Sequence, residues 1–186
     1  MFEPKISSDA VRRNILVPPM FEQVEVSAVL PLEEVRVDMA EMKTTNKPFE
    51  LVACVGSCIA VCFFDSSAKC GGMSHVMLPE AKICPKENLP GKFGDTAVPA
   101  LIKAMKLFNN DCILSAKIAG GANMFPNIRN YSLAIGAKNT EAVKAALYSN
   151  NISLQGEDVG GTQGRKVCLN TLTGRVSVRK LNGEVK

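Results

Sequence analysis

The fold of this 186-residue chain is decided by the stretch Leu51-Val-Ala-Cys-Val-Gly-Ser-Cys-Ile-Ala-Val-Cys-Phe-Phe-Asp65. Its branched and aromatic residues predict a buried strand, then a small-residue turn at Gly56 and Ser57, then a second apolar segment that begins either a strand or a helix. Such a turn projects the side chain of Cys58 and directs backbone N–H groups toward one point. Those N–H groups lower the pKa of a thiol and can hold the oxyanion of a tetrahedral intermediate.

The chain has a single histidine, His75, at the end of Gly71-Gly-Met-Ser-His75. A cysteine nucleophile needs a base that forms its thiolate and an acid that protonates the leaving group, and imidazole does both near neutral pH. Cys58 and His75 are therefore the candidate nucleophile and base. The residues alone leave an alternative open, in which Cys58 is an inert buried thiol and His75 is a hydrogen-bonded structural residue beside an apolar run.

The composition predicts one globular domain, with 46% hydrophobic and 22% charged residues. The net charge of +4 comes from scattered basic residues and only 5% are aromatic, which argues against nucleic-acid binding. Seven cysteines without a recognisable signal peptide favour reduced thiols and the cytoplasm. No apolar run approaches the roughly eighteen residues that cross a bilayer, so direct membrane insertion is not expected.

An arm is expected to precede the domain. Residues 1–31 contain Val17-Pro-Pro19 and Leu30-Pro31, which favour an extended or partly disordered segment. Residues 32–186 are expected to form a single domain. Periodicity predicts strands at 35–42, 49–55, 59–64, 72–78, 114–118, 152–156, 166–170 and 175–180, and helices at 96–109 and from 139 onward. The second helix is expected to have Asn139 or Thr140 as its N-cap.

Three strand pairs organise the expected domain. Strands 35–42 and 49–55 are expected to form a hairpin that leads into the Gly-Ser-Cys turn. Strands 59–64 and 72–78 form a second pair that brings Cys58 near His75. Strands 166–170 and 175–180 close the domain around a turn at Thr173 and Gly174. Two helices and about eight strands, many of them antiparallel, predict an α+β fold.

Five short blocks of the sequence are informative when they are taken together and in order. They are Gly56-Ser-Cys-Ile-Ala-Val-Cys62, Gly72-Met-Ser-His-Val-Met-Leu-Pro79, Ala116-Lys-Ile-Ala-Gly-Gly-Ala-Asn-Met-Phe125, Ile135-Gly-Ala-Lys-Asn139 and Glu157-Asp-Val-Gly-Gly-Thr-Gln-Gly-Arg165. Together, and in this order, they resemble the CheD family, the chemoreceptor glutamine deamidases of bacterial chemotaxis. The resemblance runs from about Val35 to about Lys180 and leaves the first 31 residues outside.

The resemblance implies a compact sandwich of mixed and antiparallel sheets with helices packed outside, and no cofactor. The spacing of Cys58 and His75 fits the pair that the family uses. The resemblance implies that His75 takes the proton of Cys58 and that the thiolate attacks a glutamine side chain on the cytoplasmic helices of a chemoreceptor. A thioester forms, and its hydrolysis leaves glutamate. A CheC-type phosphatase is a further partner that the family implies.

The orienting residue departs from the family pattern. The family has a threonine six positions before its cysteine, and Val52 stands there in this chain. The backbone carbonyl of Val52, or the hydroxyl of Ser57 or Ser74, is expected to orient the imidazole instead. Cys54 likewise occupies a position where the family commonly has glycine.

The remaining site residues are expected to act around this pair. The backbone at Gly56, Ser57 and Ile59 is expected to form the oxyanion-binding turn. A surrounding set is expected near the site, with Asp158 and Arg165 as a local ion pair. This set comprises Gly72, Ser74, Gly120, Gly121, Phe125, Asp158 and Arg165.

Other site classes fit the sequence less well. A zinc site would draw on Cys58, Cys62, Cys70, His75 and Cys84, but their spacing lacks the tight ligand pair of a structural site, so no metal is expected. The glycine pair Gly120-Gly121 lacks both nucleotide-binding patterns. Two alternatives stay open, a non-catalytic adaptor that binds a CheC-type phosphatase or a receptor, and a cysteine peptidase or transglutaminase-like acyl transferase.

Overall fold

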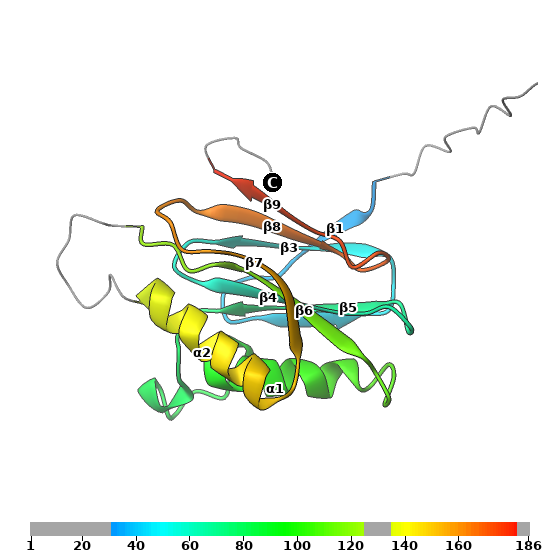
Figure 1. Cartoon of the computed structure of the whole chain (residues 1–186), viewed down its shortest axis with the longest axis horizontal. Coiled ribbons are helices and arrows are strands. Elements are labelled where there is room, and N and C mark those ends of the chain that lie inside the picture. Colours follow the sequence, from blue (N-terminus) through cyan, green and yellow to red (C-terminus); the bar gives the residue numbers. More distant parts are fainter. Residues whose placement is uncertain (1–30, 125–134, 182–186) are drawn as a thin grey trace, which may run out of the picture. The chain divides into compact units, whose positions relative to one another are not determined.

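Two β-sheets lie face to face, and two helices cover the outer face of one of them (Figure 1). The computed structural model describes residues 31–124 and 135–181. The four-stranded sheet has the order β1-β3-β8-β9, with strands Glu33–Arg36, Phe49–Val55, Arg165–Asn170 and Val176–Lys180. The five-stranded sheet has the order β2-β5-β4-β6-β7, with strands Met42–Thr45, Cys70–Val76, Ile59–Asp65, Leu114–Gly120 and Ser153–Val159.

The helices α1 (Gly94–Met105) and α2 (Ile135–Ser149) pack against the five-stranded sheet. Two short 3₁₀ turns, η1 (Ala81–Ile83) and η2 (Pro90–Lys92), lie between β5 and α1. The expected α+β sandwich with helices outside is confirmed. The expected arm over residues 1–31 lies outside the described residues apart from Pro31.

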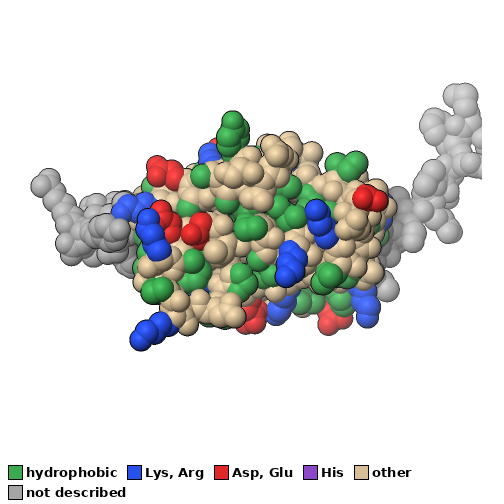
Figure 2. Space-filling view, turned by 90° about the horizontal axis from the view of Figure 1, so that it is seen from below, with side chains coloured by type: hydrophobic (Ala, Val, Ile, Leu, Met, Phe, Trp, Pro, Cys, Tyr) green, Lys and Arg blue, Asp and Glu red, His purple; other side chains and the backbone are tan. Residues whose placement is uncertain are grey.

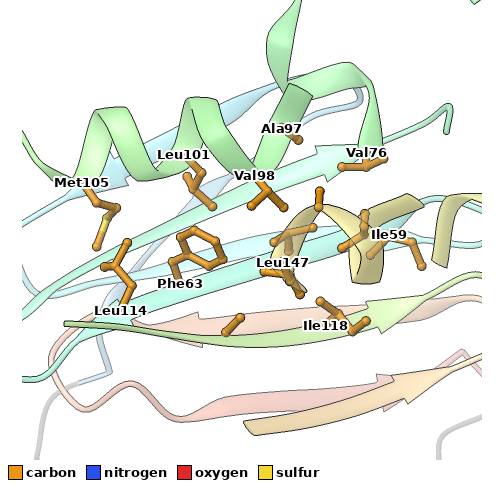
Figure 3. Packing of buried hydrophobic residues seen from close by; sticks show 14 of the residues in the cluster. Ile59, Phe63, Val76, Ala97, Val98, Leu101, Met105, Leu114, Ile118 and Leu147 are labelled. Carbon is orange, nitrogen blue, oxygen red and sulfur yellow. The ribbon is translucent and has the colours of Figure 1, made fainter. Parts of the chain in front are cut away.

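Strand β4 is buried on both of its faces, which explains the continuous apolar run in the sequence. Its odd-numbered residues point toward the helices, where Val98 and Leu101 of α1 and Leu147 of α2 gather around Phe63 (Figure 3). Its even-numbered residues Ala60 and Cys62 point into the space between the two sheets. The segment after Cys58 is therefore a strand, one of the two structures that the sequence allowed.

The turn at residues 56–58 carries the chain from one sheet to the other. Strand β3 pairs with β8 in the four-stranded sheet, whereas β4 pairs with β5 and β6 in the five-stranded sheet. The predicted antiparallel pairing of 59–64 with 72–78 is confirmed. So is the pairing of β8 with β9 that closes the domain.

The expected strand over residues 35–42 is wrong because a turn interrupts it. β1 ends at Arg36 and β2 begins at Met42, and Glu41 N–H donates to Asp38 O at 3.0 Å between them. Ala40 in this turn has a positive φ of 65°. β1 then runs parallel to β3 and β2 joins the other sheet beside β5, so the expected hairpin does not form.

Both helices differ from their expected limits. α1 runs from Gly94 to Met105 and so ends four residues before the expected limit at residue 109, and Phe108 beyond its end is 38% exposed. α2 begins at Ile135, four residues before the expected N-cap, so Asn139 and Thr140 lie inside the helix. The hydroxyl of Thr140 donates to Gly136 O within the same helix. Asn139 is fully buried and its amide is used elsewhere, as described below.

Basic and acidic side chains are interspersed on the face of the molecule that carries the helices. Figure 2 shows this face, with Lys and Arg side chains lying apart from one another among acidic and apolar ones. This distribution agrees with the scattered basic residues of the sequence. Among the helices that the structure describes, none is long and apolar enough to cross a membrane.

Candidate active site

Cys58 lies at the end of the turn between β3 and β4, and backbone hydrogen bonds hold this turn on both sides. Gly121 N–H donates to Cys58 O, and Ala122 N–H donates to Gly56 O, each at 2.8 Å. Gly120 has a φ of 125°, and a Cβ at this position would lie 2.1 Å from Cys58 O. Only glycine fits there. The structure thus brings Gly120 and Gly121 against the backbone of the candidate nucleophile.

The side chain of Cys58 is half-buried and packs against the core between the two sheets. Burial raises the pKa of the Cys58 thiol, and its own backbone N–H acts in the opposite direction. The thiol is therefore protonated at rest. A nearby base is needed to form the thiolate during a reaction.

His75 is buried near the end of β5, with 3% of its surface exposed. Its Nδ1 lies 3.2 Å from the carbonyl oxygen of Val37. Because a carbonyl oxygen only accepts, Nδ1 carries the hydrogen and Nε2 keeps a free lone pair. Burial lowers the pKa of His75, opposed by the hydrogen bond to Val37 and the charge of Asp38. The ring is thus neutral at pH 7 and able to accept a proton.

The turn between β1 and β2 surrounds His75. His75 N–H donates to Glu41 O at 2.9 Å, and Ala40 N–H donates to His75 O at 3.1 Å. With the contact of Val37 to the ring, one short segment fixes both the backbone and the imidazole. Val37 was not predictable as a site residue, because its backbone carbonyl acts here and a carbonyl leaves no signature in the residue type.

Strand pairing brings the segments that carry Cys58 and His75 to the same end of the five-stranded sheet. Ala60 lies directly opposite His75, and Ile59 lies opposite Val76. The ladder ends at the pair of Ile59 and Val76, so Cys58, in the bend directly before β4, lies at the same end of the sheet as His75. Side chains alternate along a strand, so His75 points to the same side as Met73, into the space between the sheets. Cys58 packs against that same core.

Val52 contributes to the site through Val37. Its carbonyl accepts from Val37 N–H at 2.8 Å, while the ring is held by the carbonyl of Val37 itself. The carbonyl that accepts the hydrogen bond from the imidazole is therefore that of Val37, whereas the sequence predicted that of Val52. The Val52 side chain is 4% exposed and lines the same cleft as His75.

Two further expected residues face away from His75. The Ser74 hydroxyl donates to Gly91 O at 3.0 Å, and Ser74 neighbours His75 on the strand, so it points to the opposite, helical face. A Cβ at Gly72 would lie 2.8 Å from Thr44 and 3.0 Å from Leu101 of α1. Both residues serve the packing of the helical layer. The Ser74 hydroxyl therefore does not orient the imidazole, which was one of the roles expected of it.

A cleft of about 610 Å³ reaches His75 from the surface. It also reaches an exposed thiol, Cys54, on β3. Lys166 and Glu34 at its rim form an ion pair of 2.6 Å. Its lining residues are Glu34, Arg36, Val37, Asp38, Met39, Val52, Cys54, His75 and Lys166. The cleft connects His75 to the surface, and the thiol among its lining residues is that of Cys54 and not that of Cys58.

The predicted ion pair between Asp158 and Arg165 is present, with Arg165 Nε 2.9 Å from Asp158 Oδ1. Arg165 is 4% exposed and also donates to Gly160 O at 2.7 Å. Gly160 N–H in turn donates to Gly120 O at 2.9 Å. The loop that follows β7 is thereby tied to the glycine segment that holds Cys58. Phe125, expected in this neighbourhood, lies outside the described residues.

None of the seven cysteines is in a disulfide. No group of three or more His, Cys, Asp or Glu side chains that could hold a metal occurs within residues 31–124 and 135–181. Ile59 faces Gly120 and Val76 across its two strand ladders. Gly56 and Ser57 form the bend before Cys58, as expected.

Comparisons with known proteins point to one family. A family model described as CheD chemotactic sensory transduction matches residues 77–180. The probable chemoreceptor glutamine deamidase CheD of Clostridium acetobutylicum is 40% identical over 151 residues, covering 80% of this chain and 91% of that protein. The chemoreceptor glutamine deamidase CheD of Thermotoga maritima is 46% identical over 130 residues, covering 69% and 80%.

One solved structure is also similar, at a much greater distance. It is the Bacillus licheniformis hypothetical protein YfiH, with a TM-score of 0.38 and 16% identity, covering 63% of this chain and 49% of that one.

Proposed function

The chain belongs to the CheD family, and we propose that Cys58 and His75 deamidate glutamine side chains of chemoreceptors. The relatives named chemoreceptor glutamine deamidase support this substrate and this reaction. One structural observation carries the assignment of roles. The Nδ1–H of His75 is held by the Val37 carbonyl, which leaves the lone pair of Nε2 to act as a base at the end of the five-stranded sheet where Cys58 lies.

The reaction follows from the protonation states at rest. Nε2 of His75 takes the proton of the Cys58 thiol, and the sulfur attacks the amide carbon of the glutamine side chain. Backbone N–H groups of the turn at Gly56, Ser57 and Cys58 hold the oxyanion. The imidazolium gives its proton to the departing ammonia, and a thioester remains. Water activated by His75 then hydrolyses the thioester, leaving glutamate and a free thiol.

The decisive experiment is mass spectrometry of a cytoplasmic receptor fragment incubated with the protein. Deamidation adds about one dalton, whereas peptide cleavage gives fragments and acyl transfer to an amine joins chains. We expect conversion by the wild-type protein and none by Cys58→Ala or His75→Ala. Cys54→Ala is the matched control, because Cys54 lies on the same cleft as His75. If Cys54→Ala lost conversion while Cys58→Ala retained it, the nucleophile would be Cys54.

A non-catalytic adaptor is the second candidate, and Val52 is the observation that favours it. Its side chain has no hydroxyl and lines the cleft at His75. In this role the protein would bind a CheC-type phosphatase or a receptor in the cytoplasm, where the free thiols stay reduced. Binding without conversion by well-folded wild-type protein would establish the adaptor. Conversion that requires Cys58 would exclude it as the main role.

A further inference from the structure

The side chain of Asn139 joins the two segments that carry Cys58 and His75. Asn139 lies in α2 and is fully buried. Its Nδ2 donates to Ser57 O at 3.0 Å and to Met77 O at 2.9 Å. Ser57 directly precedes Cys58, and Met77 lies two residues after His75. One amide group therefore fixes the nucleophile's turn relative to the end of the strand that holds the base.

The orientation of this amide is determined by its partners. Both partners of Asn139 are carbonyl oxygens, which only accept, so the nitrogen must face them. The Oδ1 atom then points the other way and is buried with no hydrogen-bond partner among the described residues. An unpaired buried oxygen destabilises the fold. The fold therefore retains the two hydrogen bonds that Nδ2 donates, although Oδ1 has no partner among the described residues.

Peptide geometry extends the effect of Asn139 to Cys58. The Ser57 carbonyl and the Cys58 N–H belong to one trans peptide unit and point in opposite directions. Holding the carbonyl toward α2 thus directs the Cys58 N–H away from the helix. On the other side of Cys58, Gly121 N–H holds the Cys58 carbonyl at 2.8 Å. Both peptide planes that flank the nucleophile are fixed.

Close backbone packing keeps α2 in place for this contact. A Cβ at Gly136 would lie 2.5 Å from Gly121 O, so the helix begins in direct contact with the segment that holds Cys58. A Cβ at Gly94 would lie 2.8 Å from Ala142 Cβ, which shows an equally close approach of α1 to α2. The helix that carries Asn139 therefore has little freedom to shift relative to Cys58.

We propose that Asn139 is a positioning residue for deamidation, which aims the Cys58 N–H at the sulfur and at the oxyanion that forms beside it. This inference rests on the proposed function of Cys58 and His75. It agrees with the effect of the Cys58 N–H on its own thiol, whose pKa it lowers. Asn139 touches neither the substrate nor the reacting atoms, and acts through the Ser57 carbonyl.

The test replaces the amide by an apolar group of similar size, Asn139→Leu. We expect kcat on a receptor fragment to fall by about 10- to 100-fold with KM nearly unchanged, somewhat less than the loss of a direct oxyanion donor. The pH profile of Cys58 alkylation by iodoacetamide, followed by peptide mass spectrometry, is expected to move to higher pH. Asn139→Ser, which keeps one donor, is expected to lose less, and it replaces Asn139→Leu if that variant does not fold.

Val143→Ala is the matched control, because Val143 is equally buried in α2 but belongs to the core between the helices and the sheet. It is expected to lower stability without moving the alkylation profile or kcat. The inference is overturned if the Asn139 variants keep the wild-type profile and kcat, or if Val143→Ala changes both equally. If the proposed function itself is wrong, the wild-type protein will not convert the receptor fragment. The alkylation profiles still decide the role of Asn139 in that case.

Discussion

The imidazole of His75 is held by the carbonyl of Val37, 3.2 Å away, and not by a hydroxyl side chain. Val37 begins the turn that also bonds the His75 backbone through Ala40 and Glu41. A backbone carbonyl cannot be removed by substitution, but the turn that places it can be strained. The conformation of Ala40 therefore offers a direct test of this arrangement.

Ala40 has a positive φ of 65°, a region that glycine occupies without strain. Ala40→Val is expected to lower the free energy of unfolding by about 1–2 kcal/mol, because a branched side chain resists this backbone conformation. It is also expected to lower kcat by disturbing the Val37 contact. Ala40→Gly is the control, with stability and kcat at or above wild type. Urea unfolding and receptor deamidation measure both, and equal values for the Val and Gly variants would contradict the role of this turn.

Stability and activity are expected to fall at acidic pH because His75 is buried as a neutral ring. Its pKa in the folded protein lies below the ordinary value of 6.5, so the unfolded chain binds the proton more readily. The stabilisation that comes from the neutral His75 ring is fully present above pH 6.5. It is lost as the pH falls from there through the pKa that His75 has in the folded protein. Urea unfolding between pH 5 and 7.5 should show a lower free energy of unfolding at the acidic end, and His75→Gln should weaken this pH dependence. The acidic limb of kcat/KM is expected to have its midpoint below 6.5 as well.

Thr at position 52 is expected to bring no gain in activity. Val52 is 4% exposed, and the ring it borders is already positioned by the Val37 carbonyl. Val52→Thr should keep kcat within about threefold and lower the free energy of unfolding by about 1–3 kcal/mol if its hydroxyl finds no partner. A large increase in kcat would show that the carbonyl is an incomplete substitute for a hydroxyl. Val52→Ala, which also lacks a hydroxyl, separates that effect from a change in volume.

The apolar patterns were enough to predict that strands 59–64 and 72–78 pair, and this pairing brings the segments that carry Cys58 and His75 to the same end of the five-stranded sheet. The turn at Ala40 was not predictable, because nothing in an alanine indicates a positive φ. Asn139 was misread for a related reason. Asparagine is a common helix cap, and only the tertiary structure shows that its amide reaches two carbonyls from other segments.

Cysteine labelling is expected to follow burial and pKa. Cys54 is exposed, Cys58 is half-buried, and burial raises the pKa of Cys62 to about 12. Iodoacetamide at pH 8 should therefore modify Cys54 first and Cys58 more slowly, and Cys62 only when the protein unfolds. Peptide mass spectrometry with and without urea measures the order. Rapid labelling of Cys62 in the folded protein would contradict the packing between the sheets.

Gly120 is expected to be the least replaceable glycine near Cys58. A Cβ there would lie 2.1 Å from the Cys58 carbonyl oxygen, and the φ of 125° disfavours any other residue. Gly120→Ala must push the turn away from β6, which breaks the bond from Gly121 N–H to Cys58 O. We expect deamidation to be lost and the free energy of unfolding to fall by about 3 kcal/mol or more.

Gly156 on β7 provides the control on the neighbouring strand of the same sheet. A Cβ at Gly156 would meet only the Lys117 side chain at 3.8 Å, an ordinary contact, and Gly156 has no positive φ. Gly156→Ala should therefore fold and deamidate like wild type, with unfolding free energy higher by up to about 1 kcal/mol because the unfolded chain loses freedom. If Gly120→Ala behaved like Gly156→Ala, the Cys58 turn would tolerate displacement. The fixed peptide planes on either side of Cys58 would then have no bearing on the reaction.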